Sequence, residues 1–340
     1  MGADIAIDLG TSRTRIYVDK HGLVVDEPTV VAVNSDTGEI IAVGEKAYQM
    51  VGRVSKKVAV VWPLEGGAIS DFYLVEGLIS KLFKRVSSSK IVMPRVVTCV
   101  PGEITEVEKR ALVNVISSIG VRKVCLIEEP IAAAKGAGLD INSPHGRIIV
   151  DIGGGTTNIA IISLGGIASS KSIKVAGNTM DDEIIKYVRR NHSMFIGKRM
   201  AEDAKKAIGR VFPSRTDMTY RLKGRDSVTG LPKTLDITSD EMLDILSEPA
   251  MQIVKQIQQI LEYAPPELAG DIYTDGITMT GGGAQLKGFS DLIAKKTKLK
   301  VTLANHPSNC VIMGAGNSLK YIDDLEKKGY SVMNPLTADY

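Results

Sequence analysis

Residues 148–162 read Ile-Ile-Val-Asp-Ile-Gly-Gly-Gly-Thr-Thr-Asn-Ile-Ala-Ile-Ile. An apolar run that ends at an aspartate, a glycine turn that carries threonines, and a second apolar run are typical of two β-strands joined by a tight turn. The chain opens with the same order, because residues 5–9 lead through Gly10 and Thr11 into residues 15–18. Two copies of one strand–turn–strand unit predict two similar α/β halves.

The remaining sequence predicts strands and helices around these two copies. Apolar residues recur at helical spacing from 105 to 119, and Gly120 follows where a capping glycine is expected. Further strands are expected at 24–33, 40–43 and 276–279, with a polar strand-rich insertion at 220–237. Further helices are expected at 182–190, at 239–263 and from 310 to 325. We expect the polar tail that follows to be poorly ordered.

Composition restricts the class of protein. The 340 residues suggest two domains, and 44% hydrophobic with 24% charged residues are the values of an ordinary globular protein. A net charge of +3 gives no indication of nucleic-acid binding. The three cysteines, Cys99, Cys125 and Cys310, form no C-x-x-C pair, which excludes a disulfide scaffold or thiolate zinc site and favours a reducing cytoplasm. No run reaches the roughly 18 apolar residues of a membrane-spanning helix, so we expect any membrane contact to be peripheral.

Three glycine turns follow apolar strands, at residues 8–11, 151–157 and 280–284. Glycine lets a backbone approach a polyphosphate closely, and successive N–H groups form a concave anion site. Asp8 and Asp151 end the leading strands, and such carboxylates suit a hydrated Mg²⁺. Any one turn is equally well a structural hairpin, and none has the Walker A spacing. The three turns together favour a clamp on a phosphate chain.

The three turns in this order resemble those of the actin, Hsp70 and sugar-kinase superfamily, and most closely those of the MreB-like bacterial actins. The segments that carry the resemblance are ITEVEKRA at 104–111, LIEEPIAAA at 126–134, SLGGI at 163–167, VTGLPK at 228–233 and PPELA at 265–269. The resemblance implies an actin-like α/β fold, with two similar halves around a nucleotide cleft, each with a smaller subdomain. Half I is expected at 1–145 plus 317–340, with its small subdomain at 31–70. Half II is expected at 146–316, with its small subdomain at 181–245.

The resemblance also implies a site for ATP or ADP with Mg²⁺, and it assigns a role to each residue of that site. Asp8 and Asp151 organise the metal, while Glu129, Thr157 and Asn158 form the catalytic set. The expected nucleotide-binding residues are Gly10, Thr11, Ser12, Arg13 and Arg15 in the first turn, Gly153, Gly154, Gly155 and Thr156 in the second, and Gly177, Glu202, Lys205, Gly281, Gly282, Gly283 and Ala284.

Several of these residues also have a plain structural interpretation. Glu129 precedes a proline at a helix start, so it either orients a water molecule or caps that helix. Glu202 and Lys205 lie on one helical face, where they embrace the base and ribose or form a solvated ion pair. Arg15 either reaches phosphate as a charged donor or lies on a solvated strand face with Arg13.

The chain departs from the MreB-like pattern at several positions. Asn158 follows the paired threonines where an acidic residue is usual, and an amide cannot accept a proton from water. Arg13 and Arg15 stand where the pattern has asparagine and an apolar residue, and Gly102-Glu103 replaces Ser-Gly. We therefore expect nucleotide binding with slow ATP hydrolysis.

A short apolar run is the candidate for membrane contact. Ile91, Val92 and Met93 occupy the place of a membrane loop in the resemblance, although the same run also suits the start of the next strand. Three inserted side chains bind weakly, so many copies in a filament would bind through avidity.

The expected function is that of a cytoskeletal protein that polymerises with itself at the inner face of the cell membrane, for cell shape or a related task. Two alternatives stay open: a nearly inactive scaffold that co-assembles with a paralogous filament protein, and a small-metabolite kinase of the same superfamily. The expected partners are other copies of the chain, paralogues and membrane lipid, and no nucleic acid.

Overall fold

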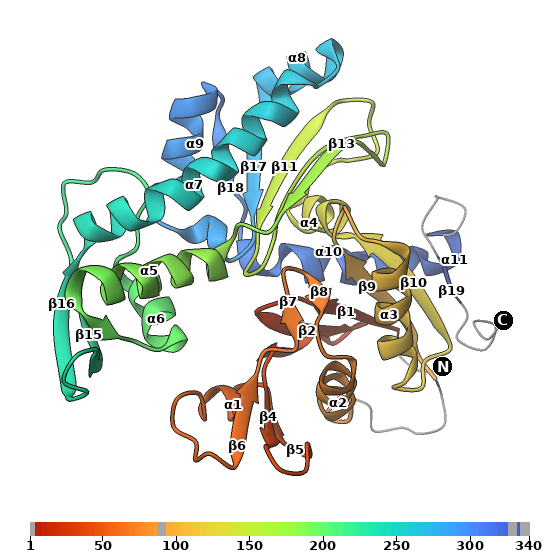
Figure 1. Ribbon diagram of the computed structural model, residues 1–340. Coiled ribbons are helices and arrows are strands. Elements are labelled where there is room, and N and C mark those ends of the chain that lie inside the picture. The colour runs from red at the N-terminus through yellow and green to blue at the C-terminus, as the bar shows by residue number, and fades with distance from the viewer. Residues whose placement is uncertain (1–3, 87–92, 326–331, 334–340) are drawn as a thin grey trace. The chain divides into compact units, whose positions relative to one another are not determined.

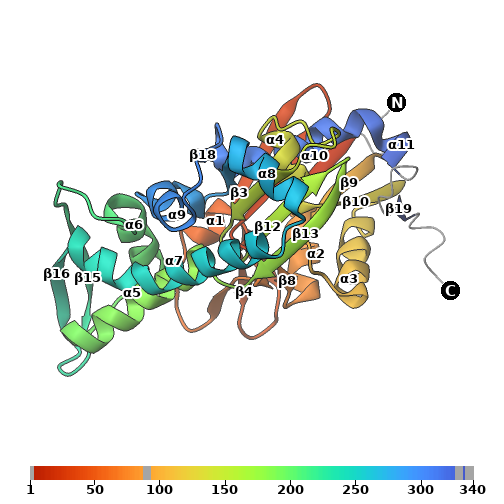
Figure 2. The same ribbon diagram turned by 90° about the horizontal axis from the view of Figure 1, so that it is seen from above.

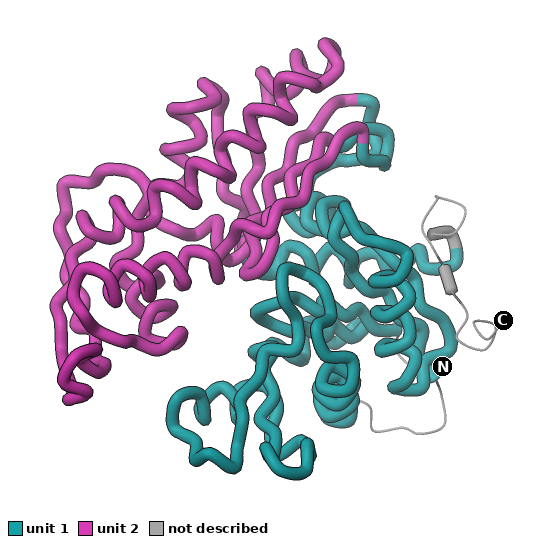
Figure 3. Tube along the Cα trace, viewed as in Figure 1, with its two compact units in different colours: residues 1–144, 162–167, 308–340 teal, residues 145–161, 168–307 magenta. Residues whose placement is uncertain are grey.

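The computed structural model describes residues 4–86, 93–325 and 332–333. The chain divides into two compact units (Figure 3). Unit 1 holds residues 1–144, 162–167 and 308–340, and unit 2 holds residues 145–161 and 168–307. Each unit is described by itself below.

Unit 1 is built on a six-stranded sheet in the order β19-β10-β9-β1-β2-β3. Strands β1 (Ile5–Leu9), β2 (Arg13–Val18) and β3 (Gly22–Pro28) form an antiparallel meander. β9 (Arg95–Val100) runs parallel to β1, and β10 (Lys123–Glu128) runs parallel to β9. All five residues of β1 are buried, as expected of a central strand covered on both faces.

Unit 2 repeats this arrangement with a five-stranded sheet in the order β13-β12-β11-β17-β18. Its strands are β11 (Arg147–Ile152), β12 (Thr157–Ser163), β13 (Gly166–Ile173), β17 (Ile277–Thr280) and β18 (Val301–Leu303). β17 runs parallel to β11, as β9 does to β1, and β18 runs parallel to β17. The prediction of two similar α/β halves is therefore confirmed.

Helices cover both faces of the unit 1 sheet (Figure 1). α2 (Phe72–Phe83) and α3 (Glu106–Ser117) pack on one face, and α4 (Glu129–Gly136) and α10 (Cys310–Ser318) lie together on the other. α3 begins at a capping box in which Thr105 and Glu108 satisfy each other's backbone N–H groups. α4 and α10 approach closely because Gly136 and Gly314 lack side chains: a Cβ on Gly314 would lie 1.8 Å from the Ala132 carbonyl oxygen.

Unit 2 carries α5 (Gly177–His192), α6 (Lys198–Ile208), α7 (Ser239–Glu262), α8 (Pro266–Asp275) and α9 (Phe289–Thr297). The 24-residue α7 runs beside α5 (Figure 2) and starts at a capping box formed by Thr238 and Glu241. Its buried apolar face joins the strands of the large sheet in one core.

Each unit also has a small three-stranded sheet. In unit 1, β4 (Val31–Asn34) lies between β5 (Ile40–Val43) and β6 (Val58–Val61), next to α1 (Glu45–Tyr48). In unit 2, β15 (Thr219–Asp226) lies between β14 (Met194–Phe195) and β16 (Pro232–Thr238), and α6 packs on β15. A short hairpin of β7 (Leu64–Glu65) and β8 (Ala68–Ile69) lies in unit 1.

Three element predictions are corrected by the structure. The strand expected at 24–33 breaks after Pro28, because Thr29 turns away to hydrogen-bond the first glycine turn. The helix expected at 182–190 begins at Gly177. The helix expected at 310–325 is divided into α10, η3 (Leu319–Tyr321) and α11 (Ile322–Leu325). Most of the predicted polar tail lies outside the described residues; within it, β19 (Val332–Met333) pairs with β10.

Two further 3₁₀ turns, η1 (Gly283–Gln285) and η2 (Pro307–Asn309), complete the elements. Over the described part of the chain, no helix combines the length and the apolar character needed to cross a membrane.

Candidate functional site

The first glycine turn joins β1 to β2 in unit 1, and hydrogen bonds fix its backbone. Gly10 N–H donates to the Arg13 carbonyl at 3.1 Å, and a Cβ on Gly10 would lie 2.9 Å from that oxygen. Thr29 donates its hydroxyl to the Gly10 carbonyl at 2.7 Å and its N–H to the Ser12 carbonyl at 3.0 Å. The Thr11 hydroxyl accepts from Gly67 N–H at 2.9 Å, which ties the turn to the β7–β8 hairpin.

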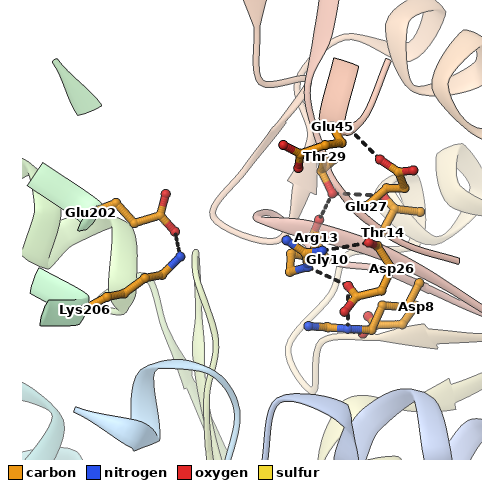
Figure 4. Close-up of polar contacts among 11 residues, drawn as sticks. Asp8, Gly10, Arg13, Thr14, Asp26, Glu27, Thr29, Glu45, Glu202 and Lys206 are labelled. Atoms are coloured by element: carbon orange, nitrogen blue, oxygen red, sulfur yellow. Dashed lines mark hydrogen bonds and ion pairs between the residues drawn. The ribbon is translucent and has the colours of Figure 1, made fainter. Parts of the chain in front are cut away.

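Four charged side chains gather beside this turn. Arg15 Nη1 lies 3.4 Å from Asp8 Oδ2, and Arg15 Nε lies 3.2 Å from Asp26 Oδ1. Arg13 Nε contacts the same Asp26 oxygen at 2.5 Å (Figure 4). Burial raises the pKa of Asp8, and the Arg15 guanidinium opposes that rise. The Arg13 side chain is 40% exposed but that of Arg15 only 11%, so Arg15 does not lie on a solvated face.

In unit 2 the structure brings together three glycine segments. Gly153 N–H donates to the Thr156 carbonyl at 2.9 Å, which closes the second turn. The first N–H groups of α5, from Gly177 and Asn178, donate to the Gly153 and Gly154 carbonyls at 3.2 and 2.7 Å.

The third glycine segment packs on the strand that leads into this turn. A Cβ on Gly281 would lie 2.2 Å from the Ile152 carbonyl oxygen, and Gly281 has a φ of +88°. A Cβ on Gly283 would lie 3.2 Å from the Gly153 carbonyl oxygen. Gly153, Gly154, Gly177, Gly281 and Gly283 therefore pack closely together, and Ala284 is buried.

The polar residues of the second turn are buried and have defined partners. Thr280 donates its hydroxyl to Asp151 Oδ1 at 2.7 Å, so β11 and β17 are joined at their carboxyl ends. The Thr157 hydroxyl donates to the Val175 carbonyl at 2.7 Å. Asn158 is 1% exposed, and its side-chain oxygen accepts from the Ser172 hydroxyl at 2.7 Å.

The structure does not pair Glu202 with Lys205. Lys205 Nζ donates to the Gly177 carbonyl at 2.7 Å and lies 2.8 Å from Asp181 Oδ1, so α6 is tied to the start of α5. Glu202 Oε1 lies 2.6 Å from Lys206 Nζ (Figure 4). Burial raises the pKa of Asp181 to about 6, although Lys205 opposes the rise.

Sequence reasoning missed two carboxylates of these networks, Asp26 and Asp181. Asp26 lies on β3 opposite Arg15, and the alternation of β3 was the only signal that could have placed it there. Asp181 carried no motif signal, because its role depends on the packing of α6 on α5.

The expected catalytic carboxylate, Glu129, and the expected membrane segment, residues 91–93, both belong to unit 1. Glu129 is the first residue of α4, directly before Pro130, and is half-buried. Ile91 and Val92 lie outside the described residues, and Met93 is 59% exposed.

A family model described as MreB/Mbl protein matches residues 2–327. The chain belongs to the MreB/Mbl family. It is 43% identical over 326 residues to the cell shape-determining protein Mbl of Bacillus cereus, covering 96% of this chain and 98% of that protein. It is 41% identical over 326 residues to the cell shape-determining protein MreB of Escherichia coli, covering 94% of each chain.

Solved structures have a fold similar to that of this MreB/Mbl chain. MreB5 of Spiroplasma citri bound to ADP gives a TM-score of 0.92 at 39% identity, over 97% of this chain and 99% of that one. A MamK double helical filament gives a TM-score of 0.81 at 21% identity, over 94% of this chain and 99% of that one. The fold of this MreB/Mbl chain is therefore actin-like, as predicted.

The carboxylates of this MreB/Mbl chain fit the donor chemistry of a magnesium site. Within the described ranges, no three His, Cys, Asp or Glu side chains gather in a cluster that could hold a metal ion. Mg²⁺ needs fewer protein ligands than that, because it keeps several waters and takes one or two carboxylates together with phosphate oxygens. Asp8 and Asp151, each buried at the end of a strand before a glycine turn, have this character.

Proposed function

We propose that this MreB/Mbl-family chain binds ATP and polymerises into cytoskeletal filaments for cell shape or a related task. The observation that carries the proposal is the close packing of Gly153, Gly154, Gly177, Gly281 and Gly283 in unit 2. This close packing brings the second turn, the start of α5 and the third glycine segment together, and successive backbone N–H groups of a glycine turn form a concave anion site. The relative MreB5 of Spiroplasma citri has been solved with ADP and with AMPPNP, which supports nucleotide binding by this chain.

We propose that each of the two glycine turns, one in unit 1 and one in unit 2, binds phosphate. The N–H groups of Gly10 and Gly153 close their own turns, so the backbone N–H groups at 11–12 and at 154–156 would bind phosphate oxygens. Asp8 in unit 1 and Asp151 in unit 2 are each proposed as a carboxylate for Mg²⁺, which would supply positive charge to the phosphates when bound. Lys205 would hold the Gly177 end of α5 against the second turn, and so fix the backbone there.

We propose that hydrolysis is slow. Asn158 cannot accept a proton from an attacking water, and its side-chain oxygen already accepts the Ser172 hydroxyl. Glu129, at the start of α4, remains the carboxylate that could orient a water molecule. Hydrolysis would therefore rely on a single orienting carboxylate.

We also propose peripheral membrane binding through residues 91–93. Met93 offers an apolar side chain to solvent, and its exposure of 59% supports a contact surface. A filament would present this segment many times, which multiplies a weak single contact.

Sedimentation and phosphate release, measured together with ATP, ADP or no nucleotide, test the main proposal. The expected result is pelleted protofilaments that require ATP, with slow phosphate release. No binding of ATP by a folded chain would refute the nucleotide proposal. ATP binding without any polymer would refute self-assembly.

One alternative retains support from specific residues. The buried amide of Asn158 and the Arg15–Asp8 contact both disfavour rapid hydrolysis, as expected of a scaffold that co-assembles with an active paralogue. That alternative predicts polymer only after a paralogous filament protein is added.

A further inference from the structure

The strongest feature outside the roles assigned above is the closed charge network at the first glycine turn. It contains two carboxylates, Asp8 and Asp26, and two guanidinium groups, Arg13 and Arg15. All of these ionic contacts lie within unit 1, on the adjacent strands β1, β2 and β3. The four formal charges sum to zero without any bound ion.

The two arginines have different positions in the network. They alternate onto one face of β2. The Arg13 side chain forms an ion pair with Asp26 Oδ1 at 2.5 Å and donates to the Asp26 backbone carbonyl at 2.7 Å. Arg15 bridges Asp26 and Asp8 and is the more buried of the two. Arg15 therefore places a fixed positive charge against the carboxylate that we assign to the metal.

We propose that Arg15 supplies at Asp8 part of the positive charge that a divalent cation would otherwise supply, so that nucleotide binding depends only weakly on Mg²⁺. This inference rests on the proposed nucleotide site. It makes Arg15 a positioning residue that acts through Asp8.

Two effects of Arg15 act in the same direction. A metal-free polyphosphate that approaches an unpaired, buried carboxylate is repelled, and the guanidinium reduces that repulsion. A Mg²⁺ ion that approaches Asp8 meets the same guanidinium and must compete with it for the carboxylate. The first effect strengthens nucleotide binding without metal, and the second weakens the gain from metal.

The measurement is the affinity of the purified full chain for a fluorescent ATP analogue, in excess Mg²⁺ and in EDTA. The ratio of the two affinities is the metal dependence. For Arg15→Leu this ratio should rise by about tenfold or more. The reason is that a unit charge a few ångströms from Asp8 changes the affinity of a charged ligand there by about that factor. Arg15→Lys keeps a positive charge and should restore most of the original ratio.

Two further variants serve as controls. Arg85→Leu removes a cation from the neighbouring carboxylate of Glu27, with its ion pair at 2.6 Å, and should leave the ratio unchanged. Arg13→Leu removes a partner of Asp26 but not of Asp8, so its effect on the ratio should be smaller than that of Arg15→Leu. Urea unfolding of each variant establishes that it is folded, and Arg15→Gln replaces Arg15→Leu where the leucine variant is not.

The outcomes separate this inference from the proposed function. A folded wild-type chain that binds no nucleotide in either condition would refute the proposed site. Nucleotide binding with the same ratio in wild type and in the Arg15 variant would overturn the inference alone. An equal loss of affinity with and without Mg²⁺ would also overturn it, because it would mean that Arg15 contacts phosphate directly.

Discussion

Replacing Gly314 by alanine should destabilise unit 1, because this glycine allows α10 to touch the backbone of α4. The new Cβ would lie 1.8 Å from the Ala132 carbonyl oxygen, whereas real Cβ atoms stay beyond 3.0 Å, so the helices would have to separate by about 1.2 Å. Overpacking against a rigid neighbour costs about 3 kcal/mol. Alanine recovers about 1 kcal/mol of helix propensity, which leaves a net loss of about 2 kcal/mol.

The chain offers a matched control in Gly270, a helical glycine of α8 with nothing within 4 Å of its missing Cβ. Gly270→Ala should gain about 1 kcal/mol by the same propensity argument. Urea unfolding of unit 1 can be followed by the fluorescence of Trp62, the one tryptophan of the sequence, and overall unfolding by circular dichroism. A Gly314→Ala variant as stable as wild type would refute the argument that this contact is backbone-limited.

Three further predictions concern charge, hydrolysis and membrane binding. Burial raises the pKa of Asp181 to about 6, so the folded chain keeps a proton that the unfolded chain has lost, and stability should fall by up to about 3 kcal/mol as pH rises from 4 to 7. Asp181→Asn should remove this pH dependence of stability. If the free energy of unfolding in urea falls between pH 4 and pH 7 by the same amount in the variant and in wild type, Asp181 is not its source. Asn158→Asp should raise phosphate release at equal filament content, and equal turnover would show that Asn158 does not limit hydrolysis. Serine at 91–93 should abolish co-sedimentation of filaments with liposomes, and undiminished binding would place the membrane contact elsewhere.

The duplicated sheets could be predicted because their signals are local. Strand alternation, the aspartates at the strand ends and the glycine turns all lie within short stretches, and β1–β2 and β11–β12 follow them. The capped start of α3 after Thr105 has the same origin, since a capping box is a four-residue pattern.

What could not be predicted depends on contacts between distant segments. The break at Thr29 exists because that residue holds the Gly10 turn, 19 residues away. Lys205 turns to Gly177 and Asp181 rather than to Glu202 because α5 packs against α6. Helical spacing alone placed Glu202 and Lys205 on one face but could not show which neighbour each would meet.

The return of the chain to unit 1 sets an order for folding during synthesis. Unit 2 is complete once residue 307 has been made, whereas the α4 face of the unit 1 sheet stays uncovered until α10 follows it. In a nascent chain, the parts of α4, β1 and β9 that α10 later covers therefore stay exposed throughout the synthesis of unit 2. Such a surface is a target for chaperones and for premature association, and it closes only when the last glycine-rich helix emerges.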